Sequence, residues 1–282
     1  DPFGGWIDWR SLPPLFLNNI LIQNGGGAGP WGNRSLSGVI RLDTVNFDST
    51  NQALDIKYGS NDTRQADFIV SSKYENMSFF IGGNISKTDG FFGIKKTQRG
   101  IADLPLSRSG ETVRLSAKFR NSSDIKFLIS SQFSSDNFQN GSALAGSSSK
   151  DYQLSIAALK DNINNFLNWE SRLFYRKKDF ENIFEAFSST RDASRPVLDQ
   201  FDVPSDAIGG NIKLRWLINQ DLVLENGIDF QLLTGSTNEK FRNLGNGFTR
   251  LRNAGGEQLL IGGFFETNYK ISNKTLVNSG LR

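Results

Sequence analysis

The sequence predicts an all-β fold, about half of a transmembrane antiparallel up-and-down β-barrel that follows a short N-terminal segment of different character. From residue 52 onward, apolar and polar residues alternate with a period of two, as in strands with one apolar face. From residue 75 onward, short and long connections alternate, as in barrels with short turns on one side of a membrane and long loops on the other. The chain lacks the roughly 18 consecutive apolar residues of a spanning helix.

The alternating stretches define about eleven strands. In residues 112–120, for example, every second residue is apolar and the residues between them are polar. The strands that this pattern predicts cover residues 52–58, 64–74, 77–86, 112–120, 125–134, 151–159, 165–178, 211–218, 221–234, 257–271 and 275–282.

The connections between these strands indicate which ends of the strands lie together. In hydrocarbon every backbone polar group must be paired, so a sheet crosses a membrane only as a closed barrel. Bacterial barrels normally have an even number of strands, and roughly 22 strands around a plugged lumen is the architecture of large transporters. Eleven strands therefore predict a fragment that holds half of such a barrel. Short connections are expected at 75–76, 121–124, 161–164, near 220 and at 272–274, and long ones at 87–111, 135–150, 179–206 and 235–256.

Aromatic residues occur near many of the expected strand ends. Such residues form girdles at the two membrane interfaces of outer-membrane barrels, although ordinary β-propensity also places aromatic residues in strands. The candidates for the girdles are Tyr58, Tyr74, Phe133, Phe138, Tyr152, Tyr175, Phe180 and Tyr269.

The composition argues against an enzyme and against a nucleic-acid-binding protein. The chain contains no Cys and no His, which removes thiol nucleophiles, Ser-His-Asp triads, imidazole acid-base chemistry and Cys-based zinc sites. We therefore expect no catalytic residues, no metal site and no cofactor. The net charge is +3, from 32 basic and 29 acidic residues, and no long Lys/Arg run is present, so nucleic acid is not an expected partner.

The first 46 residues are rich in Gly, Pro and Trp and include GGGAGPWGNRSLSGVIRL at residues 25–42. This order, a Gly-rich turn, an aromatic-Gly step and a small-Gly-Val-Ile strand, resembles the end of the plug domain of TonB-dependent outer-membrane receptors. Residues 1–9 and the Leu12–Pro13 step resemble the plug loop that precedes it. The resemblance implies that residues 1–46 are the C-terminal part of a plug and residues 47–282 the first half of the barrel. The plug motif residues are Gly25, Gly26, Gly27, Gly29, Trp31, Gly32 and Gly38.

The Gly-rich stretch has two other interpretations, a flexible linker and a phosphate-binding loop. A phosphate loop needs a strand before it, a helix after it and usually a Lys-Ser/Thr ending. Here the stretch continues into the strand-like Gly38-Val39-Ile40, with no such ending.

One feature departs from the family pattern. Family members commonly carry a Glu and an Arg just before the Gly-rich turn, and the Arg contributes to an ionic latch between plug and barrel wall. Leu21 and Asn24 occupy those places here. Arg34 and Arg41 are the candidates to replace the missing charges.

The resemblance implies energy-coupled uptake, across the bacterial outer membrane, of a scarce ligand such as an iron-siderophore complex. The implied partners are TonB, through an N-terminal motif absent from this chain, the lipid bilayer and a small-molecule ligand such as a metal chelate. The complete protein is expected to be a monomer. The main rival is a passive porin or surface adhesin barrel without energy coupling. A barrel enzyme would lack a His base, and a soluble β-rich binding protein would need its apolar faces to meet in a core.

Two groups of residues are candidates for ligand binding. Phe3, Trp6 and Trp9 match the apical plug region, where they either stack on a flat ligand or pack the plug against the wall. Lys95, Lys96 and Arg99, together with Arg191 and Arg195, either attract an anionic ligand or form a solvated loop surface. Five further cations are expected to face the lumen and to contact water, the plug or paired acids: Arg114, Lys118, Arg120, Lys213 and Arg215.

Overall fold

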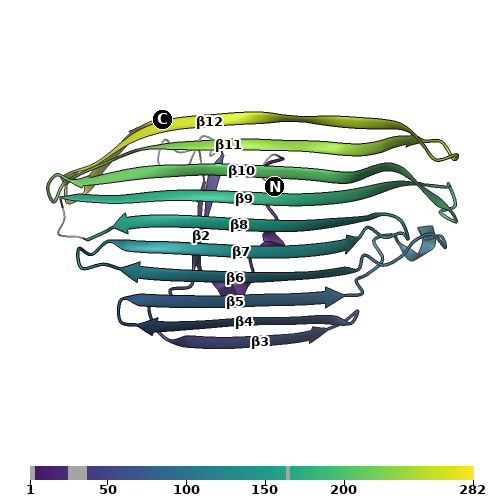
Figure 1. Cartoon of the computed structure of the whole chain (residues 1–282), viewed down its shortest axis with the longest axis horizontal. Coiled ribbons are helices and arrows are strands. Elements are labelled where there is room, and N and C mark those ends of the chain that lie inside the picture. The colour runs from purple at the N-terminus through teal and green to yellow at the C-terminus, as the bar shows by residue number, and fades with distance from the viewer. Residues whose placement is uncertain (1–3, 25–36, 163–165) are drawn as a thin grey trace.

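The computed structural model describes residues 4–24, 37–162 and 166–282, which form two antiparallel sheets. The smaller sheet is a hairpin of β1 (Leu17–Asn24) and β2 (Gly38–Thr44). The larger sheet has eleven strands, β3 to β13, which lie in sequence order, each paired with its neighbours along the chain (Figure 1). This arrangement confirms the prediction of an all-β, up-and-down antiparallel sheet. The sheet is open, as expected for part of a barrel.

The later strands of the large sheet, β9 to β12, are longer than the earlier ones, and the last strand, β13, has 7 residues. The early strands span 9 to 13 residues, whereas β10 and β12 span 24 and 25. Their bounds are β3 (Asn51–Gly59), β4 (Thr63–Tyr74), β5 (Met77–Thr88), β6 (Arg108–Arg120), β7 (Lys126–Gln139), β8 (Gly146–Lys160), β9 (Leu167–Phe187), β10 (Ser194–Leu217), β11 (Leu222–Asn243), β12 (Phe248–Ser272) and β13 (Thr275–Leu281).

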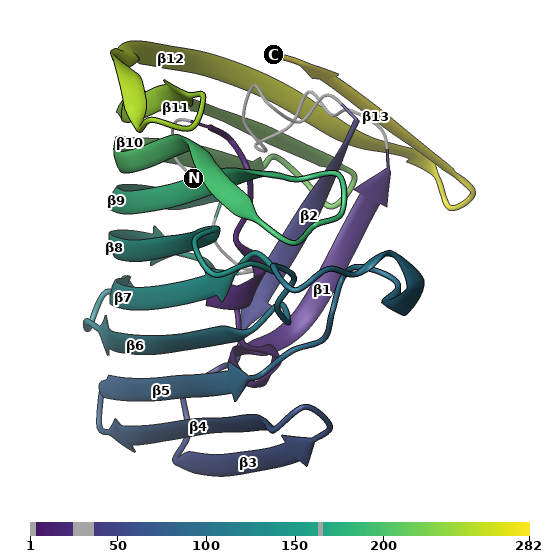
Figure 2. The same cartoon turned by 90° about the vertical axis from the view of Figure 1, so that its right-hand side faces the viewer.

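The large sheet curves, and the β1–β2 hairpin lies on its concave side (Figure 2). Side chains alternate between the two faces, so the apolar residues of each strand collect on the convex face. Across β7, β8 and β9, for instance, Ile129 lies opposite Ile156, which lies opposite Leu173. We call these exposed apolar residues the belt: Ile81, Leu115, Ile129, Leu154, Ile156, Leu173, Ile208, Ile212, Ile228 and Leu259.

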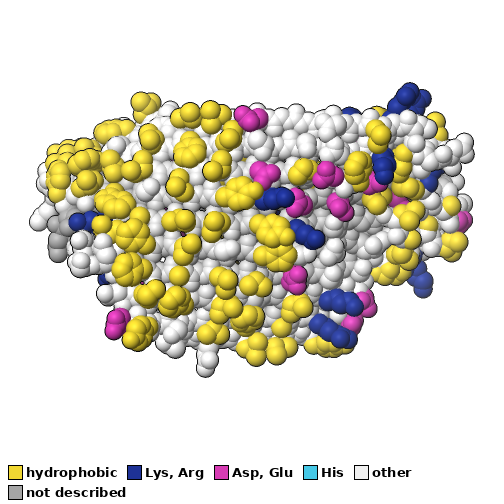
Figure 3. Space-filling model, viewed as in Figure 1, with side chains coloured by type: hydrophobic (Ala, Val, Ile, Leu, Met, Phe, Trp, Pro, Cys, Tyr) yellow, Lys and Arg dark blue, Asp and Glu magenta, His cyan; other side chains and the backbone are white. Residues whose placement is uncertain are grey.

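The belt covers only part of the convex face. It lies toward the short turns, whereas charged side chains gather toward the long connections (Figure 3). The change from apolar to charged residues falls at one row of paired residues across β7, β8, β9 and β10. This row contains Phe133, Tyr152, Lys177 and Asp206, in that order. We call the part beyond this row the extension: residues 134–151, 178–205 and 235–256. No helix among the described residues is long and apolar enough to cross a membrane.

The predicted long connections are wrong in their bounds, because most of their residues continue the strands. The connections in the structure are residues 89–107, 140–145, 188–193 and 244–247. In the extension, polar residues occupy both faces of the sheet, so the alternation of apolar and polar residues disappears while the backbone ladder continues. The pattern that predicts a strand therefore ends before the strand does.

The aromatic residues divide between the two faces. Tyr58, Tyr74, Tyr152, Tyr175 and Tyr269 are exposed, as expected for girdles. Phe180 departs from this expectation, because its ring packs edge-on against Trp6 of the N-terminal segment, with 5.8 Å between the ring centroids. It lies two residues from the buried Lys178, on the same concave face.

A small apolar core joins the N-terminal segment to the sheet. Phe16 packs with Phe47, Ile69 and Phe80, all of them buried. A Cβ on Gly82 would lie 2.6 Å from the Phe16 ring, so the glycine leaves room for this ring on the wall. The core thus holds the chain just before β1 against β4 and β5.

Candidate functional site

The N-terminal segment, residues 4–17, crosses the concave face of the sheet and contains two short 3-10 helices, η1 (Trp9–Ser11) and η2 (Pro14–Phe16). Asp8 precedes η1, and its carboxylate accepts hydrogen bonds from the backbone N–H and the Nε of Arg10, at 3.2 and 3.0 Å. The Ser11 hydroxyl donates to the Asp8 carbonyl at 2.8 Å. These contacts fix a compact turn that directs both charged side chains toward the wall.

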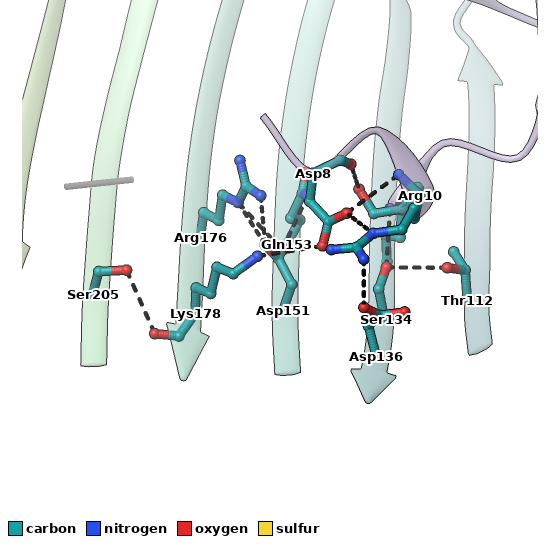
Figure 4. Close-up of polar contacts among 12 residues, drawn as sticks. Asp8, Arg10, Thr112, Ser134, Asp136, Asp151, Gln153, Arg176, Lys178 and Ser205 are labelled. Carbon is teal, nitrogen blue, oxygen red and sulfur yellow. Dashed lines mark hydrogen bonds and ion pairs between the residues drawn. The ribbon is translucent and has the colours of Figure 1, made fainter. Parts of the chain in front are cut away.

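Two ion pairs join this turn to the sheet (Figure 4). Arg10 Nη1 lies 3.1 Å from Asp136 Oδ2 of β7, and Asp136 also pairs with Arg108 of β6 at 2.5 Å. Asp8 Oδ2 lies 3.5 Å from Lys178 Nζ of β9. The turn therefore contributes one acid and one base, and each pairs with an opposite charge on the extension.

The Asp8–Lys178 pair is the more buried of the two. The Lys178 side chain has no exposed surface, and its Nζ lies 4.1 Å from the centroid of the Trp6 ring, as in a cation–π contact. Burial acts to raise the pKa of Asp8, but the hydrogen bonds and charge of Arg10 and the charge of Lys178 lower it overall. Asp8 thus stays ionised opposite the buried ammonium.

Neutral and secondary charged contacts surround the ion pairs. Gln132 Nε2 donates to the Ser11 carbonyl at 2.9 Å. Arg176 Nε donates to Asp151 at 3.0 Å, which places a second acid beside Lys178 on the neighbouring strand. The site is therefore a polar network that binds the segment from β6 to β9.

The aromatic residues predicted to bind a ligand have different surroundings in the structure. Trp6 packs on Lys178 and Phe180, with 40% of its surface still exposed, which corresponds to the packing alternative. Trp9 is half exposed. Phe3 lies outside the described residues.

The predicted loop cations also differ from one another in their exposure and contacts. Lys95 and Lys96 are exposed on the connection between β5 and β6. The Arg99 guanidinium lies 3.5 Å from the centroid of the Phe92 ring and donates to the Ile94 carbonyl at 3.2 Å. Arg99 therefore binds within its own loop.

Arg191 connects two loops, whereas Arg195 connects the ends of two neighbouring strands, β10 and β11. Arg191 makes a two-pronged ion pair with Asp103, with 2.6 Å between Nη2 and Oδ1, and its carbonyl accepts the Ala102 N–H at 3.0 Å. Arg195 Nε donates to the Asn243 carbonyl at 3.2 Å. The hydrogen bond from Arg191 lowers the pKa of Asp103. The sequence does not single out Asp103, because it lies in an irregular connection without a pattern.

The predicted plug motif is described only in part. Gly25, Gly26, Gly27, Gly29, Trp31 and Gly32 lie outside the described residues, as does Arg34. Gly38 begins β2, where a Cβ would lie 2.8 Å from the Gln23 carbonyl oxygen.

Within the described part of this chain, Arg41 does not pair with an acid of the wall. Arg41 Nε pairs with Asp43 on its own strand, at 2.8 Å. The charges that join segment and wall are instead those of Asp8 and Arg10, upstream of the positions that the sequence comparison indicated. Their spacing in the sequence gives no signal of this, because their partners lie on strands more than a hundred residues away.

The described residues contain no cluster of three His, Cys, Asp or Glu residues that could hold a metal ion. No family model and no curated protein matches the chain. Solved structures do match its fold. The copper transporter OprC superimposes with a TM-score of 0.75 at 13% identity, covering 94% of this chain and 41% of OprC.

Two further solved structures are similar. The pyoverdine outer membrane receptor FpvA from Pseudomonas aeruginosa PAO1 has a TM-score of 0.74 at 11% identity, over 94% of this chain and 45% of the receptor. The ferric yersiniabactin uptake receptor FyuA from Yersinia pestis has a TM-score of 0.65 at 13% identity, over 94% and 51%. The chain thus spans about half of these structures or less. Its fold is that of part of a TonB-dependent outer-membrane receptor, which confirms the resemblance at the level of the fold.

Proposed function

We propose that this chain is the end of the plug, residues 1–46, and the first half of the barrel, residues 47–282, of an energy-coupled receptor in the bacterial outer membrane. The complete protein would take up a scarce small-molecule ligand. TonB would act on it through a motif outside this chain. The belt would contact the lipid bilayer.

The observation that carries this proposal is the N-terminal segment bound across the concave face. Its turn is held by two ion pairs to the extension and by a hydrogen bond from Gln132 of β7. A segment held inside the wall obstructs a barrel, and polar contacts in a wet interior can be exchanged when force is applied. A passive channel requires an open lumen, so a bound segment that obstructs the lumen does not fit that function.

For the ligand we propose a metal chelate, in line with the similar structures. FpvA is described as bound to pyoverdine, and FyuA as a ferric yersiniabactin uptake receptor. We propose that Phe3, Trp6 and Trp9 contact such a ligand from the segment, and that Lys95, Lys96 and Arg99 attract it from the loop. The exposed Lys95 and Lys96 are the better placed of the loop cations, since Arg99 is engaged with Phe92.

The test uses cells that carry the complete protein and three probes: a ferric catecholate, ferric pyoverdine and copper. We expect accumulation of at least one probe that stops when an uncoupler dissipates the proton gradient. A steady open conductance of the purified protein in a planar bilayer, with uptake insensitive to the uncoupler, would establish the passive porin instead. Binding to host cells without uptake of any probe would favour the adhesin.

A further inference from the structure

A large cavity lies between the N-terminal segment and the concave face of the sheet. Its volume is about 960 Å³, and its lining includes Trp6 and Arg41 on one side and Arg114, Lys118 and Arg172 on the other. Arg176 also contributes to the lining. The cavity thus gathers five cations.

Four of these five cations are paired. Each lies close to a carboxylate of its own strand, a neighbouring strand or the chain after β2. The pairs are Arg41 with Asp43 at 2.8 Å, Lys118 with Asp48 at 2.7 Å, Arg172 with Glu170 at 3.2 Å, and Arg176 with Asp151.

The other cations expected to face the lumen are paired as well. Arg120 lies 3.5 Å from Asp124, Lys213 lies 3.9 Å from Glu170, and Arg215 lies 3.3 Å from Glu225. The sequence-based expectation of paired acids therefore holds for every member of that group except Arg114.

Arg114 has no carboxylate and no hydrogen-bond acceptor among the described residues. Its side chain lies partly buried in the middle of β6, and it lines the same cavity as Arg172. The residues across from it on the next two strands are Gln132 and Gln153, whose amides are neutral. A guanidinium that is partly withdrawn from water and shares a cavity with other cations is stabilised when an anion compensates its charge.

We propose that Arg114 is the centre of an oxyanion site that binds one carboxylate or phosphate group in this cavity. The planar guanidinium binds such a group through two parallel hydrogen bonds, and the Gln153 amide supplies a further donor from the same lining. The anion belongs either to a dissolved molecule within the lumen or to an acidic side chain of the protein outside the described residues. The proposal rests on the proposed function only in taking the concave face as the lumen of a complete barrel.

The experiment uses the complete protein, purified in detergent, with inorganic phosphate and citrate as probes. The chain contains no Cys, so Ser155→Cys introduces a single labelling site into it beside the cavity. We expect a saturable change in the fluorescence of a dye on this residue. Arg114→Gln should weaken probe binding about tenfold or more, since it removes a charged hydrogen-bonding group. Arg114→Lys should have an intermediate effect and keeps the charge if the first variant fails to fold.

Arg120→Gln is the matched control, because Arg120 lies on the same strand but outside the cavity, and it should leave probe binding unchanged. A second arm measures proteolysis of the N-terminal segment without added anion. Faster cleavage in Arg114→Gln, with no binding of either probe to the original protein, would assign the anion to the protein itself. If no probe binds and Arg114→Gln behaves like Arg120→Gln in both arms, the proposal is wrong. Neither arm requires energy coupling, so its result is separate from the uptake test.

Discussion

The belt and the extension are parts of the same strands, yet they are held by different kinds of contact. Belt residues such as Ile156 present an apolar surface whose only requirement is an apolar neighbour. The extension carries specific polar contacts on both faces, among them the pairs from Asp136 and Lys178 to the N-terminal segment. The difference shows that the alternation of apolar and polar residues depends on the surroundings of the two faces of a strand. The bounds of the strand depend instead on its backbone hydrogen bonds to the neighbouring strands.

The largest effect is expected in the extension, at the pair between the segment and the wall. Asp8→Asn keeps the size and the hydrogen-bonding capacity of the side chain but leaves the fully buried Lys178 ammonium without this carboxylate. Breaking a buried pair in this way costs about 3 kcal/mol or more. The segment should then detach, which hydrogen exchange of residues 4–17 would show as faster exchange.

Adding Lys178→Met to Asp8→Asn should restore much of the protection, because the uncompensated charge is then gone. Asp43→Asn is the control, since Asp43 pairs with the exposed Arg41 and should cost about 1 kcal/mol or less. Equal effects of Asp8→Asn and Asp43→Asn would mean that the buried pair does not hold the segment.

A charge placed on the convex face should distinguish the belt from the extension directly. Ile156→Arg puts a guanidinium into the belt and should destabilise the complete protein in lipid vesicles by about 2–4 kcal/mol. Asn137→Arg puts the same group into the extension and should cost about 0–1 kcal/mol. Urea unfolding of both variants measures the difference, and similar values would remove the basis for treating the belt as lipid-facing.

A smaller and local effect is expected where two loops of the long-loop end meet. A Cβ on Gly100 would lie 2.2 Å from the Arg191 carbonyl oxygen, so Gly100→Ala must displace one backbone from the other. Overpacking of this kind costs about 1–3 kcal/mol. Gly93→Ala is the matched control, because its Cβ would meet only the end of the Leu106 side chain, at 3.3 Å. Hydrogen exchange in residues 89–107 should quicken in the first variant and stay nearly unchanged in the second.

The smallest effect is a dependence of loop order on pH. The pKa of Asp103 is lowered in the folded protein by its hydrogen bond from Arg191, below its ordinary value of 3.8. The pair therefore contributes fully above that value, and its contribution is lost as the pH falls through the lower pKa of the folded state. Hydrogen exchange of residues 100–104 should quicken at the most acidic pH values, and Asp103→Asn should remove this dependence. A loop that loosens already near pH 6 would point to another titrating group.

The sequence predicts the belt well and the extension poorly. Strands such as residues 112–120 and 151–159 are found within β6 and β8, because an apolar convex face and a polar concave face impose strict alternation. Residues 194–206 give no such pattern, although they lie within β10, because both faces carry polar side chains there. The length of a strand in the extension is determined by its pairing with the neighbouring strands. The sequence of one strand therefore does not predict where it ends.

The candidate site was predictable only in its position along the chain. The aromatic residues of the N-terminal segment indicate where it approaches the wall, and Trp6 does contact β9. The sequence does not identify the charges that bind the segment, because Asp8 and Lys178 are 170 residues apart in the chain. Such pairs become visible only when the register of the strands is known.

The order of the strands in the large sheet also bears on how the protein reaches this structure. Each strand from β3 to β13 pairs with the strands that come directly before and after it in the chain. Apart from the connection of residues 89–107 between β5 and β6, such a meander needs no long loop to close before a hydrogen bond forms, so the entropic barrier to most additions is small. Assembly can proceed one hairpin at a time, with the last strand added always offering its free edge as the template for the next.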